Sequence, residues 1–423
     1  MRILIHGLNF SPELVGVGKY TGEMAEWLAA RGHQVRAVTA PPFNPEWKVA
    51  AGFSKFGYSR EDTRCDLANG TRESDTAAGR LTVLRCPLWV PLRPAAAKRI
   101  LHLLSFAGAS FLVMLCQIAW KPHVVLVVEP TLFCLPAALL TGRFCGAKTW
   151  LHVQDFEADA GFQLGLLKSN ALRSTIEWLE KKSMSAFDRV STISEKMLAK
   201  LIGKGVAPSV CRMFPNWVDT DAVFPLSHPS PLRAELGIAD SEIVALYAGT
   251  MARKQGLEML AEAATRLANR EGLRFIFCGE GPGREALVNL TGKLTNVQWI
   301  PLQPFARLND LLNLADIHLL PQRSDAADLV MPSKLTGMLA SGRPVVATAR
   351  SGTQIAEVVT GRGLVVEPGD GAAFASAIGE LADCFEMRQN LGASARQYAL
   401  SALKKENVLF QFEQELLCFA APE

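Results

Sequence analysis

The stretch DAADLVMPSKLTGMLASGRPVVAT, residues 325–348, contains a short amphipathic helix followed directly by a buried strand. Apolar or small residues recur at the spacing of one helix face: Leu335, Met338, Leu339 and Gly342. Gly342 and Pro344 end the helix, and the β-branched residues that follow predict the strand. The helix begins at Ser333 and Lys334 without a capping acid, so we expect its free N–H groups to face an anion.

Short apolar runs alternate with helical patterns through the rest of the chain. In the second half the predicted strands are IVALYAG (243–249), LRFIFCG (273–279), VQWIPL (297–302) and DIHLLP (316–321). In the first half they are RILIHGL (2–8), QVRAVTA (34–40), HVVLVVE (123–129), KTWLHVQ (148–154) and RVSTIS (189–194). Continuous Val, Ile and Leu strands separated by helices are typical of parallel sheets covered on both faces. The sequence therefore predicts an α/β protein with two Rossmann-like, doubly wound domains that face each other across a cleft.

The regular pattern lapses where Pro, Asp and Ser accumulate near the middle of the chain. A chain of 423 residues is too long for one ordinary core and suits two domains. We predict an N-terminal domain at 1–212, a linker at 213–228, a C-terminal domain at 229–400, and a final helix at 401–423 that returns to the N-terminal domain.

Positive charge is concentrated in the first half of the chain. Residues 1–204 hold 25 Lys and Arg against 17 Asp and Glu, or +8, and the remainder holds 19 against 24, or −5. This asymmetry indicates an anionic partner, either a membrane surface or a phosphate-bearing substrate. No basic run is interleaved with aromatic residues, so nucleic acid is the least expected partner.

Nine scattered cysteines form no Cys-x-x-Cys pair and no zinc-ligand spacing. They are typical of small buried side chains in a reducing compartment. The first residues run straight into a strand without a signal peptide. We therefore expect a cytoplasmic protein at the inner face of the cell membrane.

Residues 100–120, ILHLLSFAGASFLVMLCQIAW, form a long apolar segment bounded by Lys98, Arg99 and Lys121. About 20 apolar residues can span a bilayer. A span would put the strands before and after this segment on opposite sides of the membrane and split one sheet. We therefore favour a core helix with a basic, membrane-facing end, and a true span is the alternative.

Two loops of the first half follow strands at the edge where ligands bind in such folds. NFSPELVGVGKYTGE, residues 9–23, places Gly16 and Gly18 before a helix, which would let the backbone approach a ligand or would form a surface turn. It is not a dinucleotide fingerprint, so a dinucleotide cofactor is not expected. LHVQDFEADAG, residues 151–161, places His152 and Asp155 at a strand end, and a structural role is the alternative for this histidine.

Three loops of the second half carry glycines or basic residues at the same predicted sheet edge. They contribute Gly249, Arg253, Lys254, Gly279, Gly281, Ser333 and Lys334. Helix N-termini there offer free N–H groups and partial positive charge. Arg253, Lys254 and Lys334 together could hold a diphosphate without a metal. The Asp-x-Asp at Asp219 and Asp221 is interpreted as turn chemistry and not as a magnesium site.

Together these features resemble the retaining GT-B glycosyltransferases of family 4. The resemblance covers nearly the whole chain and rests on NFSPELVGVGKYTGEMAEWLAARGHQV, LHVQDFEAD, VSTISEKM, FPNWVD, KQGLEMLAEAA, GEGPG, MPSKLTGMLASGRPVVAT and GLVVEPGD. It is closer still to members that act in colanic-acid-type exopolysaccharide biosynthesis in SPELVGVGKYTGEM, TAPPFNPEW, PTLFC and AADLVMPSKLTGMLA.

The resemblance implies a hexosyltransferase that moves a sugar from a nucleotide diphosphate sugar onto a lipid-linked oligosaccharide with retention of configuration. It implies a GDP-sugar, with GDP-fucose as a candidate and UDP-sugars as the alternative, and no metal or other cofactor. It matches His152, Arg253 and Lys254 to catalytic positions, and Asp155 joins them as a catalytic candidate from its place at the strand end. It matches Gly16, Gly18, Ser333 and Lys334 to donor-binding positions. Gly249, Gly279 and Gly281 join these from their places in the strand-end loops, and Glu357 is a further donor-binding candidate.

One departure from the family is clear. Two glutamates of the family pattern align with Leu329 and Gly337, so both acids are absent here. The second glutamate binds the ribose of the nucleotide in the family. Asp325, Asp328 and Glu357 are candidate replacements. The loss keeps two alternatives open: a nucleotide-sugar epimerase or hydrolase on the same fold, and a non-catalytic membrane scaffold of polysaccharide assembly.

Overall fold

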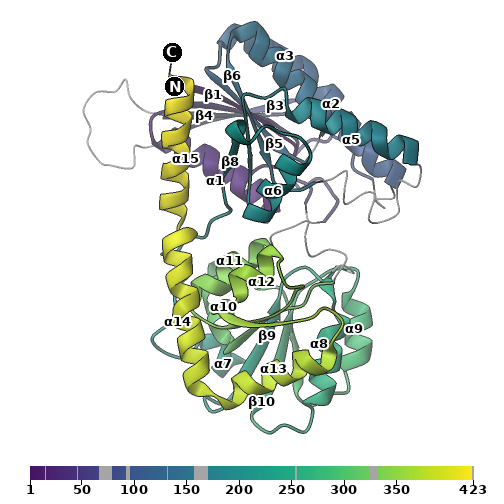
Figure 1. The fold of residues 1–423 in the computed structure, drawn as a ribbon, viewed down its shortest axis with the longest axis vertical. Coiled ribbons are helices and arrows are strands. Elements are labelled where there is room, and N and C mark those ends of the chain that lie inside the picture. The colour runs from purple at the N-terminus through teal and green to yellow at the C-terminus, as the bar shows by residue number, and fades with distance from the viewer. Residues whose placement is uncertain are drawn as a thin grey trace. The chain divides into compact units, whose positions relative to one another are not determined.

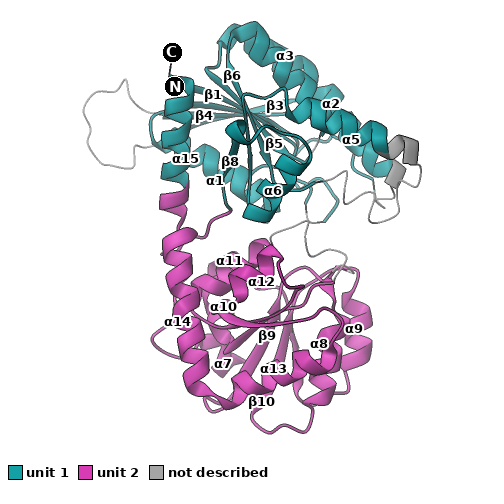
Figure 2. Cartoon of the chain, in the orientation of Figure 1, with its two compact units in different colours: residues 1–215, 409–423 teal, residues 216–408 magenta. Residues whose placement is uncertain are grey.

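The computed structural model divides the chain into two compact units. It describes residues 1–14, 16–44, 46–65, 79–91, 96–130, 132–156, 170–252, 255–323 and 332–421. Unit 1 contains residues 1–215 and 409–423, and unit 2 contains residues 216–408 (Figure 2).

Unit 1 is built on one eight-stranded sheet with the order β3-β4-β2-β1-β5-β6-β7-β8 (Figure 1). Its strands are β1 (Arg2–Gly7), β2 (Gln34–Thr39), β3 (Ser59–Cys65), β4 (Gly79–Arg85), β5 (Val124–Glu129), β6 (Lys148–Val153), β7 (Arg189–Thr192) and β8 (Cys211–Met213). Neighbouring strands are parallel except β3 and β4, which form an antiparallel edge. The strand order reverses between β1 and β5, so that is the switch point at which ligands bind in folds of this class.

The helices of unit 1 come from the first half of the chain and from its C-terminal segment. They are α1 (Gly16–Ala30), α2 (Ala96–Cys116) continued by the 3₁₀ turn η1 (Gln117–Trp120), η2 (Leu132–Cys134), α3 (Leu135–Cys145), α5 (Asn170–Met184), α6 (Glu195–Gly203), η3 (Pro208–Val210) and the end of α15 (Lys405–Ala420). In α15, Phe412 packs against Trp150, with ring centroids 5.2 Å apart. Glu413 accepts a hydrogen bond from Arg31 Nε at 3.0 Å, which ties the last helix to unit 1.

Unit 2 has a six-stranded parallel sheet with the order β11-β10-β9-β12-β13-β14. Its strands are β9 (Ile243–Ala248), β10 (Leu273–Cys278), β11 (Val297–Ile300), β12 (Ile317–Leu320), β13 (Val345–Thr348) and β14 (Gly363–Val366). Its helices are α7 (Pro231–Glu235), α8 (Glu258–Arg266), α9 (Arg284–Thr291), η5 (Phe305–Arg307), α10 (Leu308–Leu314), α11 (Ser333–Ala340), α12 (Gln354–Val359), α13 (Gly371–Asp383) and α14 (Phe385–Ala402). Numbered within the unit, this is the Rossmann order 3-2-1-4-5-6, with the switch point between β9 and β12.

The central strands are buried on both faces, which explains their continuous apolar sequence. Every residue of β5, β12 and β13 is buried. Such strands can only be stable beneath helices on both sides of the sheet. The predicted α/β class with two doubly wound domains is therefore confirmed.

The boundary between the units differs from the sequence prediction. Residues 216–228, predicted as part of a linker, belong to unit 2. Val218 and Val223 lie in its core, and Val218 pairs with Lys404 in an isolated bridge. The Pro, Asp and Ser content of this segment indicated a linker because it makes turns, but its valines anchor those turns to unit 2.

Helix α2 connects strands of a single sheet. The range Lys98–Trp120 is the one helical range among the described residues that is long and apolar enough to cross a membrane by length and composition. However, β1 pairs directly with β5, so the strands before and after the helix lie side by side. This pairing disagrees with a membrane span and agrees with a helix packed on the sheet.

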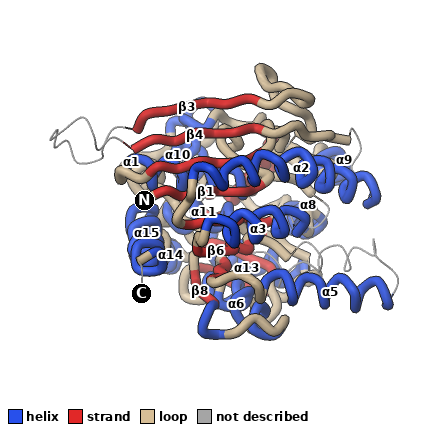
Figure 3. The backbone as a smooth tube through the Cα atoms, turned by 90° about the horizontal axis from the view of Figure 1, so that it is seen from above, coloured by secondary structure: helices blue, strands red, loops and turns tan. Residues whose placement is uncertain are grey.

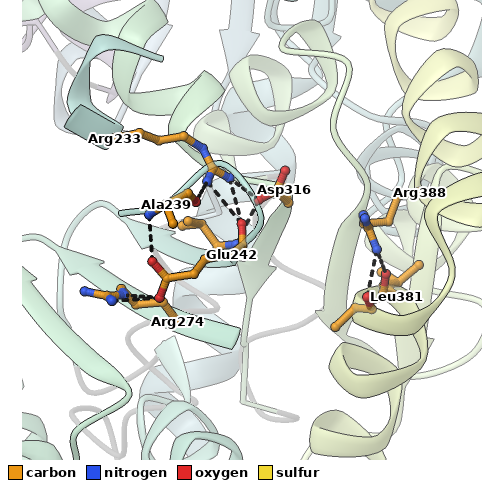
Figure 4. A network of polar contacts seen from close by, with 9 residues as sticks. Arg233, Ala239, Glu242, Arg274, Asp316, Leu381 and Arg388 are labelled. Atoms are coloured by element: carbon orange, nitrogen blue, oxygen red, sulfur yellow. Dashed lines mark hydrogen bonds and ion pairs between the residues drawn. The ribbon is translucent and has the colours of Figure 1, made fainter. Parts of the chain in front are cut away.

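A polar cluster closes the amino ends of the strands in unit 2 (Figure 4). Arg233 donates to the carbonyl oxygens of Ala239 at 3.0 Å and Glu242 at 3.1 Å, and it forms an ion pair with Asp316. The Glu242 carboxylate accepts from Arg274, and this charge together with the N–H of Ala239 lowers the pKa of Glu242 despite burial. The cluster lies at the sheet edge opposite to the ligand edge, so it serves the fold.

Candidate functional site

The switch point of unit 2 brings three separate segments together. The loop after β9 holds Gly249 and Gln255, the loop after β12 begins at Pro321, and α11 starts at Ser333. An added Cβ on Gly256 would lie 3.3 Å from the backbone of Gln322, so the two loops are in contact. The sequence prediction that these loops share one sheet edge agrees with this arrangement.

Lys334 provides positive charge at this switch point. Its Nζ lies 4.3 Å from the centroid of the Tyr247 ring and donates to Gln255 Oε1 at 3.2 Å. Within the described part of the chain, no carboxylate lies at ion-pair distance from this ammonium group. Burial lowers the pKa of Lys334 to about 7 because water is removed from around the charge. An ammonium group held this way is stabilised by an incoming anion.

The N-terminus of α11 adds to the same charge. The first turn has no acidic residue, and no side chain of a described residue caps it. Leu335 N is bonded to Pro332 O at 3.0 Å, which leaves the preceding N–H groups directed away from the helix. Ser333 is exposed there. The helix end and the ammonium group of Lys334 together can bind a phosphate group.

The glycines of this edge allow close packing of two loops. Gly249 has a φ of +133°, and an added Cβ there would lie 3.4 Å from Lys334 Cδ. An added Cβ on Gly279 would lie 2.1 Å from Gly249 O, and one on Gly281 would lie 2.6 Å from Met251 O. Because Gly279 and Gly281 have no side chain, the loop after β10 packs directly against the loop after β9. This packing is separate from any direct approach of the glycines to a ligand.

Several predicted site residues fall elsewhere. Arg253 and Lys254 lie outside the described residues, as do Asp325, Asp328 and Leu329. Gly337 lies on α11, where an added Cβ would lie 3.3 Å from Leu312 Cδ1. Glu357 is exposed in the first turn of α12, whose N-cap is Thr353.

His152 is the penultimate residue of β6 in unit 1 and is buried. Its Nδ1 lies 2.9 Å from Ser191 Oγ, and its Nε2 lies 3.1 Å from Gln154 Nε2. Trp150 Nε1 donates to the same Ser191 Oγ at 2.8 Å. Burial lowers the pKa of His152 to about 3, so its imidazole is neutral at physiological pH. A neutral ring can orient a substrate through a hydrogen bond but does not carry a charge.

Asp155 follows β6 directly and is partly buried. It thus lies at the carboxyl edge of the unit 1 sheet, as the sequence predicted from its place after the strand. Its two acidic neighbours in sequence, Glu157 and Asp159, lie outside the described residues.

The first loop is organised by a buried acid, Glu13. Its Oε1 accepts from the backbone N–H groups of Phe43 and Asn44, both at 3.0 Å, and its Oε2 accepts from Asn9 Nδ2 at 2.9 Å. An added Cβ on Gly18 would lie 2.4 Å from Glu13 Oε2. Gly18 therefore makes room for Glu13, whereas Gly16, with a φ of +62° and no atom near its Cβ direction, provides the turn.

Sequence reasoning missed Tyr247, Gln255 and Glu13 as parts of these sites. Gln255 follows the basic pair in ARKQG, and Glu13 is the acid that precedes the glycines of the first loop, so both carried a local signal. Tyr247 carried none, because an aromatic residue in a buried strand is ordinarily core.

One cluster of carboxylates has the composition of a cation site. Asp219, Asp221 and Glu406 bring oxygens within 4.8 Å of one another. Asp219 Oδ1 accepts from the N–H groups of Asp221 at 3.0 Å and Ala222 at 2.9 Å. The first aspartate therefore forms a turn, which is the interpretation that the sequence favoured.

Two family models match the chain, one in each half. The model of the glycosyl transferase 4-like domain matches residues 15–217, and the model of glycosyl transferases group 1 matches residues 242–384.

Similar proteins match over the whole length. The chain is 41% identical, over 98% of its own residues and 100% of the relative, to an Escherichia coli K12 protein named as the colanic acid biosynthesis glycosyl transferase WcaI. Sucrose-phosphate synthase of Thermosynechococcus elongatus has a similar structure, with a TM-score of 0.72 at 18% identity over 100% of both chains. Anabaena Alr3699/HepE in complex with UDP has a TM-score of 0.69 at 15% identity, over 99% of this chain and 100% of that one. These two structures support the fold alone.

Proposed function

The chain belongs to the GT-B glycosyltransferases, and on that premise we propose that it acts in colanic-acid-type exopolysaccharide biosynthesis. It transfers a sugar from a nucleotide diphosphate sugar, with a GDP-sugar favoured and GDP-fucose as a candidate, onto a lipid-linked oligosaccharide. The configuration at the transferred carbon is retained. The similarity to WcaI supports the pathway, and the charge at the unit 2 switch point supports the donor class.

The observation that carries this proposal is the ammonium group of Lys334 at the N-terminus of α11. It lies over Tyr247, hydrogen-bonded to Gln255, without a carboxylate partner among the described residues. A diphosphate bound there would receive N–H groups of the helix and a full positive charge. We assign Arg253 and Lys254 to the same diphosphate, and these three cations make a metal ion unnecessary in the proposal.

The chemistry follows from where charge develops. As the bond between the sugar and the diphosphate breaks, negative charge grows on the leaving phosphate, and fixed cations stabilise it. The acceptor hydroxyl attacks the same face of the sugar that the diphosphate leaves, and the departing phosphate takes its proton. His152, as a neutral imidazole, and Asp155 orient the sugar and the acceptor. We assign ribose binding to Glu357, because Gly337 stands at the position where the family has a ribose-binding glutamate.

The acceptor sets the location of the enzyme. A lipid-linked oligosaccharide is held in a membrane, so we propose that the protein works in the cytoplasm at the inner face of the cell membrane. The basic first half of the chain supports this proposal, because it attracts anionic lipid.

The test begins with thermal unfolding in the presence of GDP, UDP and their sugars. A ligand at about 100 times its Kd stabilises the folded protein by about 2.7 kcal/mol. We expect GDP compounds to raise the Tm of the parent, Lys334→Met to remove most of this shift, and the exposed control Lys293→Met to keep it. Equal shifts in the two variants, or no shift with any nucleotide, would contradict the assignment.

The second step measures nucleotide release with a lipid-linked acceptor. Release that depends on the acceptor supports transfer. Donor breakdown or isomerisation without acceptor would instead indicate a hydrolase or an epimerase. Nucleotide binding without release from any donor would indicate a scaffold.

A further inference from the structure

Helix α2 buries a stripe of mixed polarity and leaves leucines on its outer side. The buried stripe contains His102, Phe106, Ser110 and Met114, and it continues into η1 at Gln117. The opposite stripe contains Leu101, Leu104 and Leu112, which are exposed. In a helix that meets only water on its outer side, the outer stripe is polar. The exposed leucines therefore indicate that the outer side meets something other than water.

The inner stripe is fixed in place by hydrogen bonds. His6 Nε2 lies 3.0 Å from Ser110 Oγ, and Arg36 donates to Gln117 Oε1 at 2.8 Å. Thr141 Oγ1 in α3 donates to Met114 O at 3.2 Å. These bonds fasten α2 to the sheet and to α3, so the helix cannot turn its leucines inward.

Helix α3 and the preceding turn η2 continue the apolar surface. The two helices run side by side across unit 1 (Figures 1 and 3). Phe133, Leu140 and Phe144 are exposed on α3 and η2. We call these three residues, with Leu101, Leu104 and Leu112, the apolar face of α2 and α3. Apolar residues gathered in this way mark an interaction surface.

Positive charge predominates in the stretch of sequence that carries this face. Residues 76–154 contain eight Lys or Arg and a single acid, Glu129, which ends β5. Glu129 is buried. Exposed cations lie at the start of α2, after η1 and near the end of α3: Lys98, Arg99, Lys121 and Arg143. Cations in the first turn oppose the helix dipole, so Lys98 and Arg99 are not placed there to stabilise α2.

We propose that the apolar face of α2 and α3 is a docking surface for an anionic phospholipid bilayer, into which it inserts without crossing it. This proposal rests on the proposed function, because it specifies how the enzyme reaches a lipid-linked acceptor. The leucines and phenylalanines enter the boundary between headgroups and acyl chains, while the cations at both ends of α2 contact lipid phosphates. A second copy of the chain fits less well, because a twofold contact would place the same cations opposite one another.

The test measures binding to vesicles of phosphatidylcholine with and without phosphatidylglycerol by flotation. The parent should float with the anionic vesicles, and salt should release it. Leu112→Glu should weaken the partition by about tenfold or more, because a carboxylate is poorly tolerated below the headgroups. Leu112 is 67% exposed, so the substitution leaves the fold intact. The matched control is Leu290→Glu in α9 of unit 2, where the leucine is 62% exposed. It should float like the parent.

Three outcomes would overturn the proposal. They are failure of the parent to bind either vesicle, equal flotation of the two variants, and a dimer in solution that Leu112→Glu splits while flotation is unaffected. The nucleotide-induced Tm shift, measured on the same proteins without lipid, separates this proposal from the proposed function. A parent that fails to float but shows a normal nucleotide shift refutes only the docking surface, and a parent that floats without any nucleotide shift refutes only the donor site.

Discussion

The Nζ atom of Lys334 lies 4.3 Å from the centroid of the Tyr247 ring, whose strand β9 borders the switch point of unit 2. The ring shields the ammonium group from water and gives it no negative charge in return. Burial therefore lowers the pKa of Lys334 to about 7.

This relationship predicts that nucleotide binding depends on pH. Binding of a diphosphate favours the charged lysine and raises its pKa, so above about pH 7 the complex takes up a proton. The affinity for GDP should therefore fall as pH rises from about 7 to about 9, by up to about tenfold per unit. Calorimetric titration at several pH values measures it. Lys334→Met should bind more weakly with a flatter pH profile, and an unchanged profile in this variant would refute the role of Lys334.

The surroundings of Gly279 and Gly108 predict opposite effects of replacing each glycine by alanine. Gly279→Ala places its Cβ 2.1 Å from Gly249 O, so the loop beside Lys334 must move. We expect a loss of about 1–3 kcal/mol in the free energy of unfolding and weaker nucleotide binding. Gly108→Ala in α2 meets no atom within 4 Å and should stabilise by about 0.5–1 kcal/mol. Urea denaturation measures both, and equal effects would contradict the packing described.

The polar cluster of Figure 4 predicts a stability effect without a binding effect. The Arg233 side chain is 9% exposed and Asp316 is 21% exposed, so Arg233→Ala leaves a partly buried carboxylate without its ion-pair partner. We expect a loss of about 1–3 kcal/mol in the free energy of unfolding. Arg307→Ala is the control, because the Arg307–Glu235 pair is 31% and 52% exposed and contributes little to stability. Both variants should keep the nucleotide-induced Tm shift, and its loss in Arg233→Ala would contradict a purely structural cluster.

Three buried histidines predict how stability changes with pH. Burial lowers the pKa of His6, His152 and His318 from 6.5 to about 3. Between these values the unfolded chain binds more protons than the folded one, so the free energy of unfolding falls as pH falls. Each histidine lowers the free energy of unfolding by up to about 1.4 kcal/mol for each pH unit below 6.5 within this window. Above pH 6.5 the loss is absent, because the histidine is neutral in both states.

The variant His318→Asn tests this sign. Its unfolding free energy, measured by urea denaturation between about pH 7 and about pH 5, should change less steeply by about 1.4 kcal/mol per pH unit. An identical slope in the variant and the parent would show that His318 does not couple protonation to folding.

The sequence predicted the sheets well because buried parallel strands have a continuous apolar composition. The predicted strands at 123–129 and 243–249 match β5 and β9 within one residue at each end. The antiparallel pair β3 and β4 was missed. β3 reads SREDTRC and is polar, because it forms an edge of the sheet, so no apolar pattern indicates it.

The sequence predicted which kinds of residue form the candidate site, but not which of them are in contact. The start of α11 at Ser333 followed from the apolar spacing behind it, and its place at the sheet edge followed from the βα alternation. The contact of Lys334 with Gln255 joins residues 79 positions apart. No local pattern encodes it, because the Rossmann strand order decides which loops meet at the switch point.

By itself the sequence determined two α/β domains, the helix that begins at Ser333 and the uneven charge, because composition and periodicity are local properties. The tertiary structure alone decided which face of α2 is buried. Periodicity gives a helix two faces, and its apolar residues would ordinarily be assigned to the core. Hydrogen bonds between His6 and Ser110 of α2 and between Arg36 and Gln117 of η1 instead hold a stripe of mixed polarity against the sheet and leave the leucines outside.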